Sequence, residues 1–136
     1  MGKALGIDYG TKRTGIAITD AMQIIASGLT TVATHSLDAF IADIVLKEDI
    51  DCFVVGDPKN LDGTNTDSTG HVNGFVKRLK KLYPTTLVHH IDERFTTKIA
   101  KQSILASGIK KKGRQNKALV DEVSATIILQ NYLDYR

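Results

Sequence analysis

The stretch 4–18 constrains the fold of this chain more than any other segment. Apolar residues alternate with small or polar ones on both sides of the turn-forming residues 10–13. This period of two predicts a β-hairpin with strands over 3–9 and 14–20, whose turn needs glycine for its backbone dihedrals. Asp8 ends the first apolar run, and a carboxylate at the end of a buried strand is costly unless a positive charge meets it. We therefore expect Asp8 to face a cation.

Helix and strand patterns alternate along the rest of the chain. A third strand over 24–32, with a bulge at Gly28, would extend the hairpin. Beyond it, the periodicity predicts a helix with Ser36 as its N-cap, a central strand over 51–56, a helix from 68 to Pro84, a fifth strand over 86–91, and helices over 96–107 and 116–132. Three antiparallel strands followed by alternating helices and strands indicate an α/β domain with a mixed five-stranded sheet flanked by helices. A chain of 136 residues fits one such domain, spanning 1–136.

The bulk composition is that of an ordinary soluble globular protein, with 42% hydrophobic and 24% charged residues. The apolar runs are too short to span a bilayer, and the sequence passes from Met1 into a strand pattern without the pattern of a signal peptide. A single cysteine, Cys52, excludes an internal disulfide and suits a reducing compartment. We expect a cytoplasmic protein without a membrane partner, with Cys52 buried in the central strand.

Basic residues are concentrated in one part of the chain. Residues 77–117 hold 12 of the 18 Lys and Arg residues and 2 of the 15 acids, a formal charge of +10, whereas the rest of the chain carries −7. The bases within 77–81, taken alone, also fit the solvated face of a helix. The cluster 110–114, however, lies in a predicted loop, where like charges repel one another without a partner. The asymmetry therefore favours a polyanionic partner, nucleic acid above all.

Acidic residues follow the predicted strands at one edge of the sheet. Asp8 ends the first strand and Glu93 follows the fifth; both strands can run parallel to the central one, so their carboxyl ends share an edge. The last helix offers a third acid, Asp121 or Glu122, between which helical periodicity does not choose. Three converging carboxylates repel one another and must be protonated or bind a metal, and oxygen ligands select Mg²⁺ or Mn²⁺. Two such ions would hydrolyse a phosphodiester bond. The alternative is structural: Glu93 pairs with Arg94 or a nearby lysine, and Asp121 stabilises only the first turn of its helix.

Four motifs make the sequence recognisable. They are Gly-Ile-Asp-Tyr-Gly-Thr-Lys-Arg-Thr-Gly at 6–15, Val-Val-Gly-Asp-Pro at 54–58 with Asp-Gly-Thr at 62–64, Asp-Glu-Arg-Phe-Thr-Thr at 92–97, and Lys-Ala-Leu-Val-Asp-Glu at 117–122. In this order, over essentially the whole chain, they resemble the YqgF (RuvX) family. Its members are described as Holliday junction resolvases and as nucleases that mature the 5′ end of 16S ribosomal RNA. The resemblance implies a ribonuclease H-like fold and a metal-dependent nuclease.

The resemblance also implies site residues. Asp8, Glu93 and Asp121 would be the catalytic residues and the ligands of two Mg²⁺ or Mn²⁺ ions, which chooses Asp121 over Glu122. One position departs from the family pattern, because Asp57 stands where a leucine is common. We interpret Asp57 as an exposed residue at the start of a loop rather than as a further acid of the site.

Basic residues near these motifs are candidate contacts to nucleic acid. Lys12 and Arg13 in the hairpin turn are placed to reach a phosphate, although a solvated turn fits them equally well. The other candidates are Arg94, Lys98, Lys110, Lys111, Lys112, Arg114 and Lys117.

The leading hypothesis for activity is endonucleolytic cleavage of structured nucleic acid. The expected substrate is the 5′ end of pre-16S ribosomal RNA, and the small ribosomal subunit is the expected partner. Resolution of Holliday junctions in branched DNA is the alternative, and a non-catalytic ribosome-assembly factor that binds nucleic acid is a further one. The hairpin also resembles the phosphate-binding hairpin of actin-like ATPases, but those enclose ATP between two domains and this chain provides one. Symmetric cleavage of both strands of a four-way junction favours a homodimer, whereas trimming one RNA end does not. The sequence leaves monomer and homodimer open.

Overall fold

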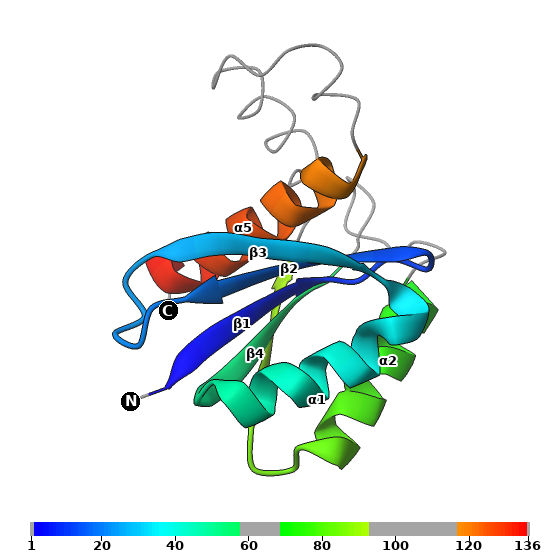
Figure 1. Ribbon diagram of the computed structural model, residues 1–136, viewed down its shortest axis with the longest axis horizontal. Coiled ribbons are helices and arrows are strands. Elements are labelled where there is room, and N and C mark those ends of the chain that lie inside the picture. The colour runs from blue at the N-terminus through cyan, green and yellow to red at the C-terminus, as the bar shows by residue number, and fades with distance from the viewer. Residues whose placement is uncertain (1, 58–68, 93–116, 136) are drawn as a thin grey trace.

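The computed structural model describes residues 2–57, 69–92 and 117–135, which form one five-stranded sheet with helices on both faces (Figure 1). The strands lie in the order β3-β2-β1-β4-β5 and are β1 (Lys3–Asp8), β2 (Arg13–Thr19), β3 (Ala26–Ala33), β4 (Ile50–Asp57) and β5 (Leu87–Asp92). The helices are the short 3₁₀ turn η1 (Thr34–Ser36), α1 (Leu37–Lys47), α2 (Thr69–Leu82) and α5 (Lys117–Tyr135). Helix α5 covers one face of the sheet, and α1 and α2 cover the other.

The sheet is mixed, as the sequence predicts. Strand β2 pairs antiparallel with both β1 and β3, whereas β4 pairs parallel with both β1 and β5. The carboxyl ends of β1, β4 and β5 therefore meet at one edge, which is where open α/β sheets bind ligands.

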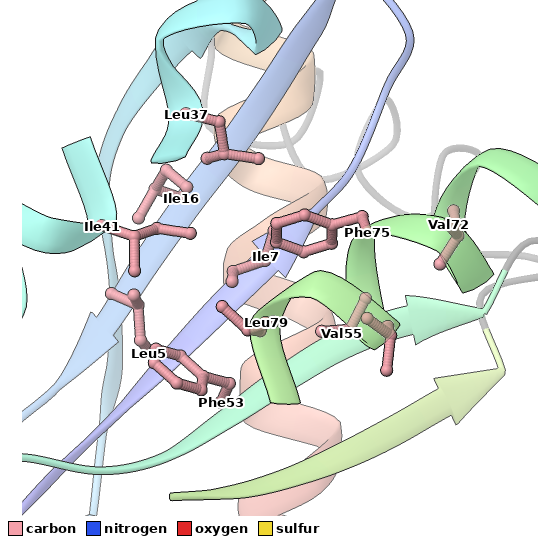
Figure 2. Close-up of a cluster of buried hydrophobic side chains, with 11 residues drawn as sticks. Leu5, Ile7, Ile16, Leu37, Ile41, Phe53, Val55, Val72, Phe75 and Leu79 are labelled. Atoms are coloured by element: carbon pink, nitrogen blue, oxygen red, sulfur yellow. The ribbon is translucent and has the colours of Figure 1, made fainter. Parts of the chain in front are cut away.

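Alternation along β1 divides the core into two parts. Leu5 and Ile7 are fully buried against α1 and α2, in a cluster that includes Phe53 and Phe75 (Figure 2). The smaller cluster under α5 consists of Ala4, Ala17, Cys52, Val54, Ala125, Ile128 and Leu129. Because residues two apart in a strand share a face, the even-numbered positions of β1 face α5. The predicted burial of Cys52 is confirmed.

Small residues let α5 approach the sheet closely. Ser124 and Ala125 of α5 are buried, and a Cβ added at Gly6 would lie 3.1 Å from the carbonyl oxygen of Ala125. On the opposite face, Tyr9 stacks on Phe75 of α2, with ring centroids 4.8 Å apart. Tyr9 thus packs at the end of its strand.

Some local expectations hold and others need correction. Gly10 does not take the left-handed φ expected of the hairpin turn; glycine is required because a Cβ would collide with the carbonyl oxygen of Arg13. Ser36 precedes α1 as expected, but its side chain makes no capping hydrogen bond. The bulge at Gly28 is confirmed, since the β2–β3 register shifts beside it. The helix expected over 96–107 lies outside the described residues.

Among the helices in the described part of the chain, none is long and apolar enough to cross a membrane.

Candidate functional site

Asp8 is the last residue of β1, and the alternation of the strand determines which way it faces. Gly6 lies directly under α5, and Asp8 is two residues further along, so its carboxylate belongs to the α5 face of the sheet. Across the sheet, Asp8 is in register with Gly15 of β2. Asp8 is half-buried, as expected for a polar residue at the end of a buried strand.

The first turns of α5 place Asp121 beside Asp8. A Cβ added at Gly15 would overlap the carbonyl oxygen of Asp121 and would lie 3.1 Å from the backbone nitrogen of Glu122. The backbone of α5 therefore rests on the backbone of Gly15, the residue opposite Asp8. Directly opposed residues of antiparallel strands have Cα atoms about 4.5–5.5 Å apart, so two acids distant in sequence lie at the same point of the sheet edge.

Sequence reasoning missed the positioning role of Gly15. The signal was available: a glycine inside a predicted strand often marks the close approach of another backbone.

The two neighbouring acids of α5 point to different strands. The Nε of Arg13 donates a hydrogen bond to Oδ2 of Asp121 at 2.8 Å, with side-chain exposures of 40% and 24%. Glu122, in contrast, lies over β3, where a Cβ at Gly28 would come within 2.6 Å of its Oε1. Asp121 is therefore the acid on the side of β1 and β2, and Glu122 is the acid on the side of β3.

Arg13 lies at the start of β2, two residues before Gly15 and on the same face. Its ion pair with Asp121 places a guanidinium at the edge of the sheet where Asp8 and Asp121 lie, which we call the acidic edge. A guanidinium at this point can neutralise a carboxylate or bind a phosphate oxygen with its planar fork of donors. Lys12, the other basic residue of the turn, is exposed.

Asp57 is not the loop residue that the sequence predicts. It is the last residue of β4 and is in register with Asp92, the last residue of β5. Val55, two residues before Asp57, packs in the cluster of α1 and α2, so Asp57 belongs to the face opposite α5. The loop interpretation failed because turn-forming residues follow Asp57, whereas the pairing with β5 extends the strand through it.

Several predicted site residues lie outside the described residues. They are Glu93, Arg94, Lys98, Lys110, Lys111, Lys112 and Arg114. Lys117 begins α5, but its side chain is not among those described.

Two oxygen-donating carboxylates are thus brought together where the sequence predicts a metal site. Within residues 2–57, 69–92 and 117–135, no group of three or more His, Cys, Asp or Glu side chains is arranged to hold a metal. The donor chemistry nevertheless fits a hard cation such as Mg²⁺ or Mn²⁺, because Asp8 and Asp121 offer carboxylate oxygens on one face and Asp121 already binds a positive group.

The order and direction of the strands, with helices on both faces, define an α/β domain of the ribonuclease H-like class. Two solved structures of this fold align with nearly the whole chain. "T. thermophilus RuvC in complex with Holliday junction substrate" matches with a TM-score of 0.60 and 14% identity, covering 98% of this chain and 96% of that one. "Thermus thermophilus RuvC structure" matches with a TM-score of 0.54 and 13% identity, covering 97% and 96%. At such identities the likeness establishes the fold.

The chain belongs to the RuvX family, described as Holliday junction resolvase, whose model matches residues 2–135. A curated relative from Flavobacterium johnsoniae, named "Putative pre-16S rRNA nuclease", is 53% identical over 133 residues, covering 98% of this chain and 96% of the relative. A relative of the same name from Bacteroides thetaiotaomicron is 50% identical over 134 residues, covering 98% and 97%. The family predicted from the four sequence motifs is confirmed.

Proposed function

We propose that this protein is a metal-dependent endonuclease, one domain spanning 1–136, that cleaves structured nucleic acid. The observation that carries the proposal is the seating of Asp121 on Gly15, opposite Asp8, with the Arg13 guanidinium at the same edge. Carboxylates that share a sheet edge with an arginine suit a reaction in which a cation and a phosphate meet.

Asp8, Asp121 and Glu93 are the proposed ligands of Mg²⁺ or Mn²⁺. The ring of His89 packs at a tilt against that of Tyr132 of α5, and Ile91 packs under the same helix, so the odd-numbered positions of β5 face α5. Glu93 is the next odd-numbered residue in the sequence. When bound, the ions supply activation of water and stabilisation of the departing oxygen.

The residues of the chain have separate tasks in this proposal. The carboxylates of Asp8 and Asp121 hold the cations, and Arg13 binds a non-bridging phosphate oxygen beside them. Lys12 and the basic residues Arg94, Lys98, Lys110, Lys111, Lys112, Arg114 and Lys117 bind the flanking phosphates, which makes the affinity depend strongly on salt.

We infer that the substrate is the 5′ end of pre-16S ribosomal RNA. The names of relatives at 50–53% identity over nearly the whole chain support this substrate. The enzyme would then act in the cytoplasm with the small ribosomal subunit as a partner, and this reaction does not require a dimer. The family description and the likeness to RuvC favour a second candidate, resolution of Holliday junctions, which calls for a homodimer. A nucleic-acid-binding assembly factor without catalysis is the third.

Cleavage assays with matched variants test the proposal. Wild-type protein, Asp8→Asn, Asp121→Asn and the control Glu122→Gln are each incubated with a precursor 16S RNA and with a four-way DNA junction, with and without Mg²⁺ or Mn²⁺. Asp8→Asn and Asp121→Asn should bind nucleic acid normally and lose cleavage. Glu122→Gln should cleave like wild type, because Glu122 lies over β3. The preferred substrate separates the first two candidates.

A thermal shift provides a readout independent of activity. Mn²⁺ should raise the melting temperature of the wild type and of Glu122→Gln, but not of Asp8→Asn or Asp121→Asn. If the wild type cleaved neither substrate with either metal, or if Asp121→Asn behaved like Glu122→Gln in both assays, the proposed active site would be wrong.

A further inference from the structure

A pocket lined by two lysines lies on the face of the sheet opposite the candidate active site. It has a volume of about 340 Å³ and opens between α2 and β5. We call it the α2–β5 pocket. It is lined by Asn73, Gly74, Val76, Lys77, Lys80 and His90. Apart from Val76 and Gly74, every lining side chain carries a hydrogen-bond donor, and two of them are cations.

The two lysines of this pocket are available to a ligand. Lys77 and Lys80 are three residues apart in α2, so they lie on the same side of the helix and both are exposed. Among the carboxylates of the described segments, none is within ion-pair distance of either. The intervening Arg78 differs, because it donates two hydrogen bonds to Asp38 of α1, at 2.7 and 3.1 Å, and this contact raises the pKa of its guanidinium.

Gly74 also lines the pocket. It occupies the interior of α2, where glycine is a poor helix former, and it is exposed. A Cβ added at this position, as at Gly70 of the same helix, would meet no atom of the described structure within 4 Å. Glycine is, however, the residue that lets another chain approach a helix most closely.

The position of the pocket relates it to the acidic edge. His90 is in register with Val55 of β4, which is in register with Ile7, the residue before Asp8. Strand β5 therefore reaches the same edge as β1, two strand spacings or about 10 Å away. In the described sheet β5 is the outermost strand on this side. A strand of nucleic acid passing around β5 would meet both faces.

We propose that the α2–β5 pocket binds a backbone phosphate of the nucleic-acid substrate, outside the cleavage site. The inference rests on the proposed function only in taking nucleic acid as the substrate. Paired lysines suit a phosphate as point charges, while Asn73 and His90 donate to its oxygens. Such a contact does not depend on the base sequence of the nucleic acid. It orients the substrate across the edge of β5.

The sharpest test uses the two exposed glycines of α2. Gly74→Glu and Gly70→Glu each remove a glycine from the same helix and add one negative charge, and a Cβ at either position has open space. Of these two glycines, Gly74 lines the pocket and Gly70 does not. We expect Gly74→Glu to weaken binding of a labelled precursor-rRNA fragment severalfold in fluorescence anisotropy, whereas Gly70→Glu stays close to wild type.

A second pair of variants separates the pocket from general surface charge. Lys77→Gln combined with Lys80→Gln should reduce the slope of log affinity against log salt concentration by about 1, because one phosphate contact is lost. Lys81→Gln, an exposed lysine of the same helix outside the pocket, should leave the slope unchanged. Circular dichroism checks that each variant is folded.

The outcomes distinguish the two proposals. Equal RNA affinities of Gly74→Glu and Gly70→Glu would refute the proposal that the α2–β5 pocket binds a backbone phosphate, even if the wild type binds and cleaves RNA. Amide resonances of Gly74 and His90 that shift with inorganic phosphate but not with the RNA fragment would indicate a site for small anions and would also overturn it. Loss of cleavage by Asp8→Asn with unchanged binding tests only the active site. No binding of nucleic acid by the wild type would refute both.

Discussion

Gly15 lets the helix that carries Asp121 rest on the strand beside Asp8, so the substitution Gly15→Ala tests the geometry of the site directly. The alanine Cβ would overlap the carbonyl oxygen of Asp121 and would lie 3.1 Å from the nitrogen of Glu122. Both are backbone atoms and cannot rotate away. Helix α5 or strand β2 must therefore move by about 1 Å or more to restore a van der Waals separation of about 3.5 Å.

The size of the effect follows from two opposing terms. Overpacking a core costs about 1–3 kcal/mol, and a clash with helix backbone belongs at the upper end of that range. Replacing glycine also restricts the unfolded chain, and this offsets the overpacking cost by about 0.4–1 kcal/mol. We expect Gly15→Ala to lower the free energy of unfolding by about 2 kcal/mol, or the urea midpoint by about 1 M. A displacement of Asp121 by about 1 Å should also reduce the cleavage rate by about 10²-fold.

Gly28→Ala is the matched control, because Gly28 lies under the same turn of α5. There the added Cβ would meet Oε1 of Glu122 at 2.6 Å, and this atom is the end of a flexible side chain that can turn into solvent. We expect its free energy of unfolding to stay within about 0.5 kcal/mol of wild type. Urea denaturation of both variants is the assay. Equal midpoints for Gly15→Ala and Gly28→Ala would refute the backbone contact on which the site is built.

Three further predictions concern charged groups. Backbone hydrogen bonds lower the pKa of Asp20 below 3.8, so its contribution to stability is complete above about pH 3.8 and is lost as the pH falls through the lowered pKa; urea denaturation of wild type and Asp20→Asn should therefore converge at low pH, and a constant difference would contradict this. Arg78 and Asp38 form an exposed two-bond pair, and a double-mutant cycle should give a coupling of about 0.5–1 kcal/mol that weakens with salt; zero coupling at low salt would show that the pair adds nothing. Arg13→Lys keeps the charge but loses the Nε donor to Asp121, and we expect cleavage to slow about tenfold with little change in RNA affinity; an unchanged rate would remove Arg13 from the site.

The arrangement of strands follows largely from local sequence. Alternating apolar residues around Asp8 predict β1 and β2, and the continuous apolar run before Gly56 predicts the central strand β4. These patterns are readable because the side chains of a strand alternate whatever lies around it. For the same reason the sequence alone places Asp8 at the end of a buried strand. Asp57 is the exception, because its turn-forming neighbours concealed the pairing with Asp92 that extends β4.

Only the tertiary structure decides which groups meet across the sheet. Asp121 and Glu122 each begin an apolar stripe of α5, and periodicity cannot choose between them. Their separation depends on the line along which α5 crosses the sheet, since Gly15 admits the backbone at Asp121 while Gly28 lies under the side chain of Glu122. The motifs of the family chose Asp121; the packing explains why that residue lies beside Asp8.

The bases of α2 illustrate the same division. In sequence, Lys77, Arg78 and Lys80 are equivalent members of one basic run. In the folded chain Arg78 is bound to Asp38, 40 positions away, whereas the two lysines line a pocket with His90 of β5. Sequence determines that charge is present on this helix. The partner of each charge depends on contacts between elements distant in the chain, which local periodicity does not encode.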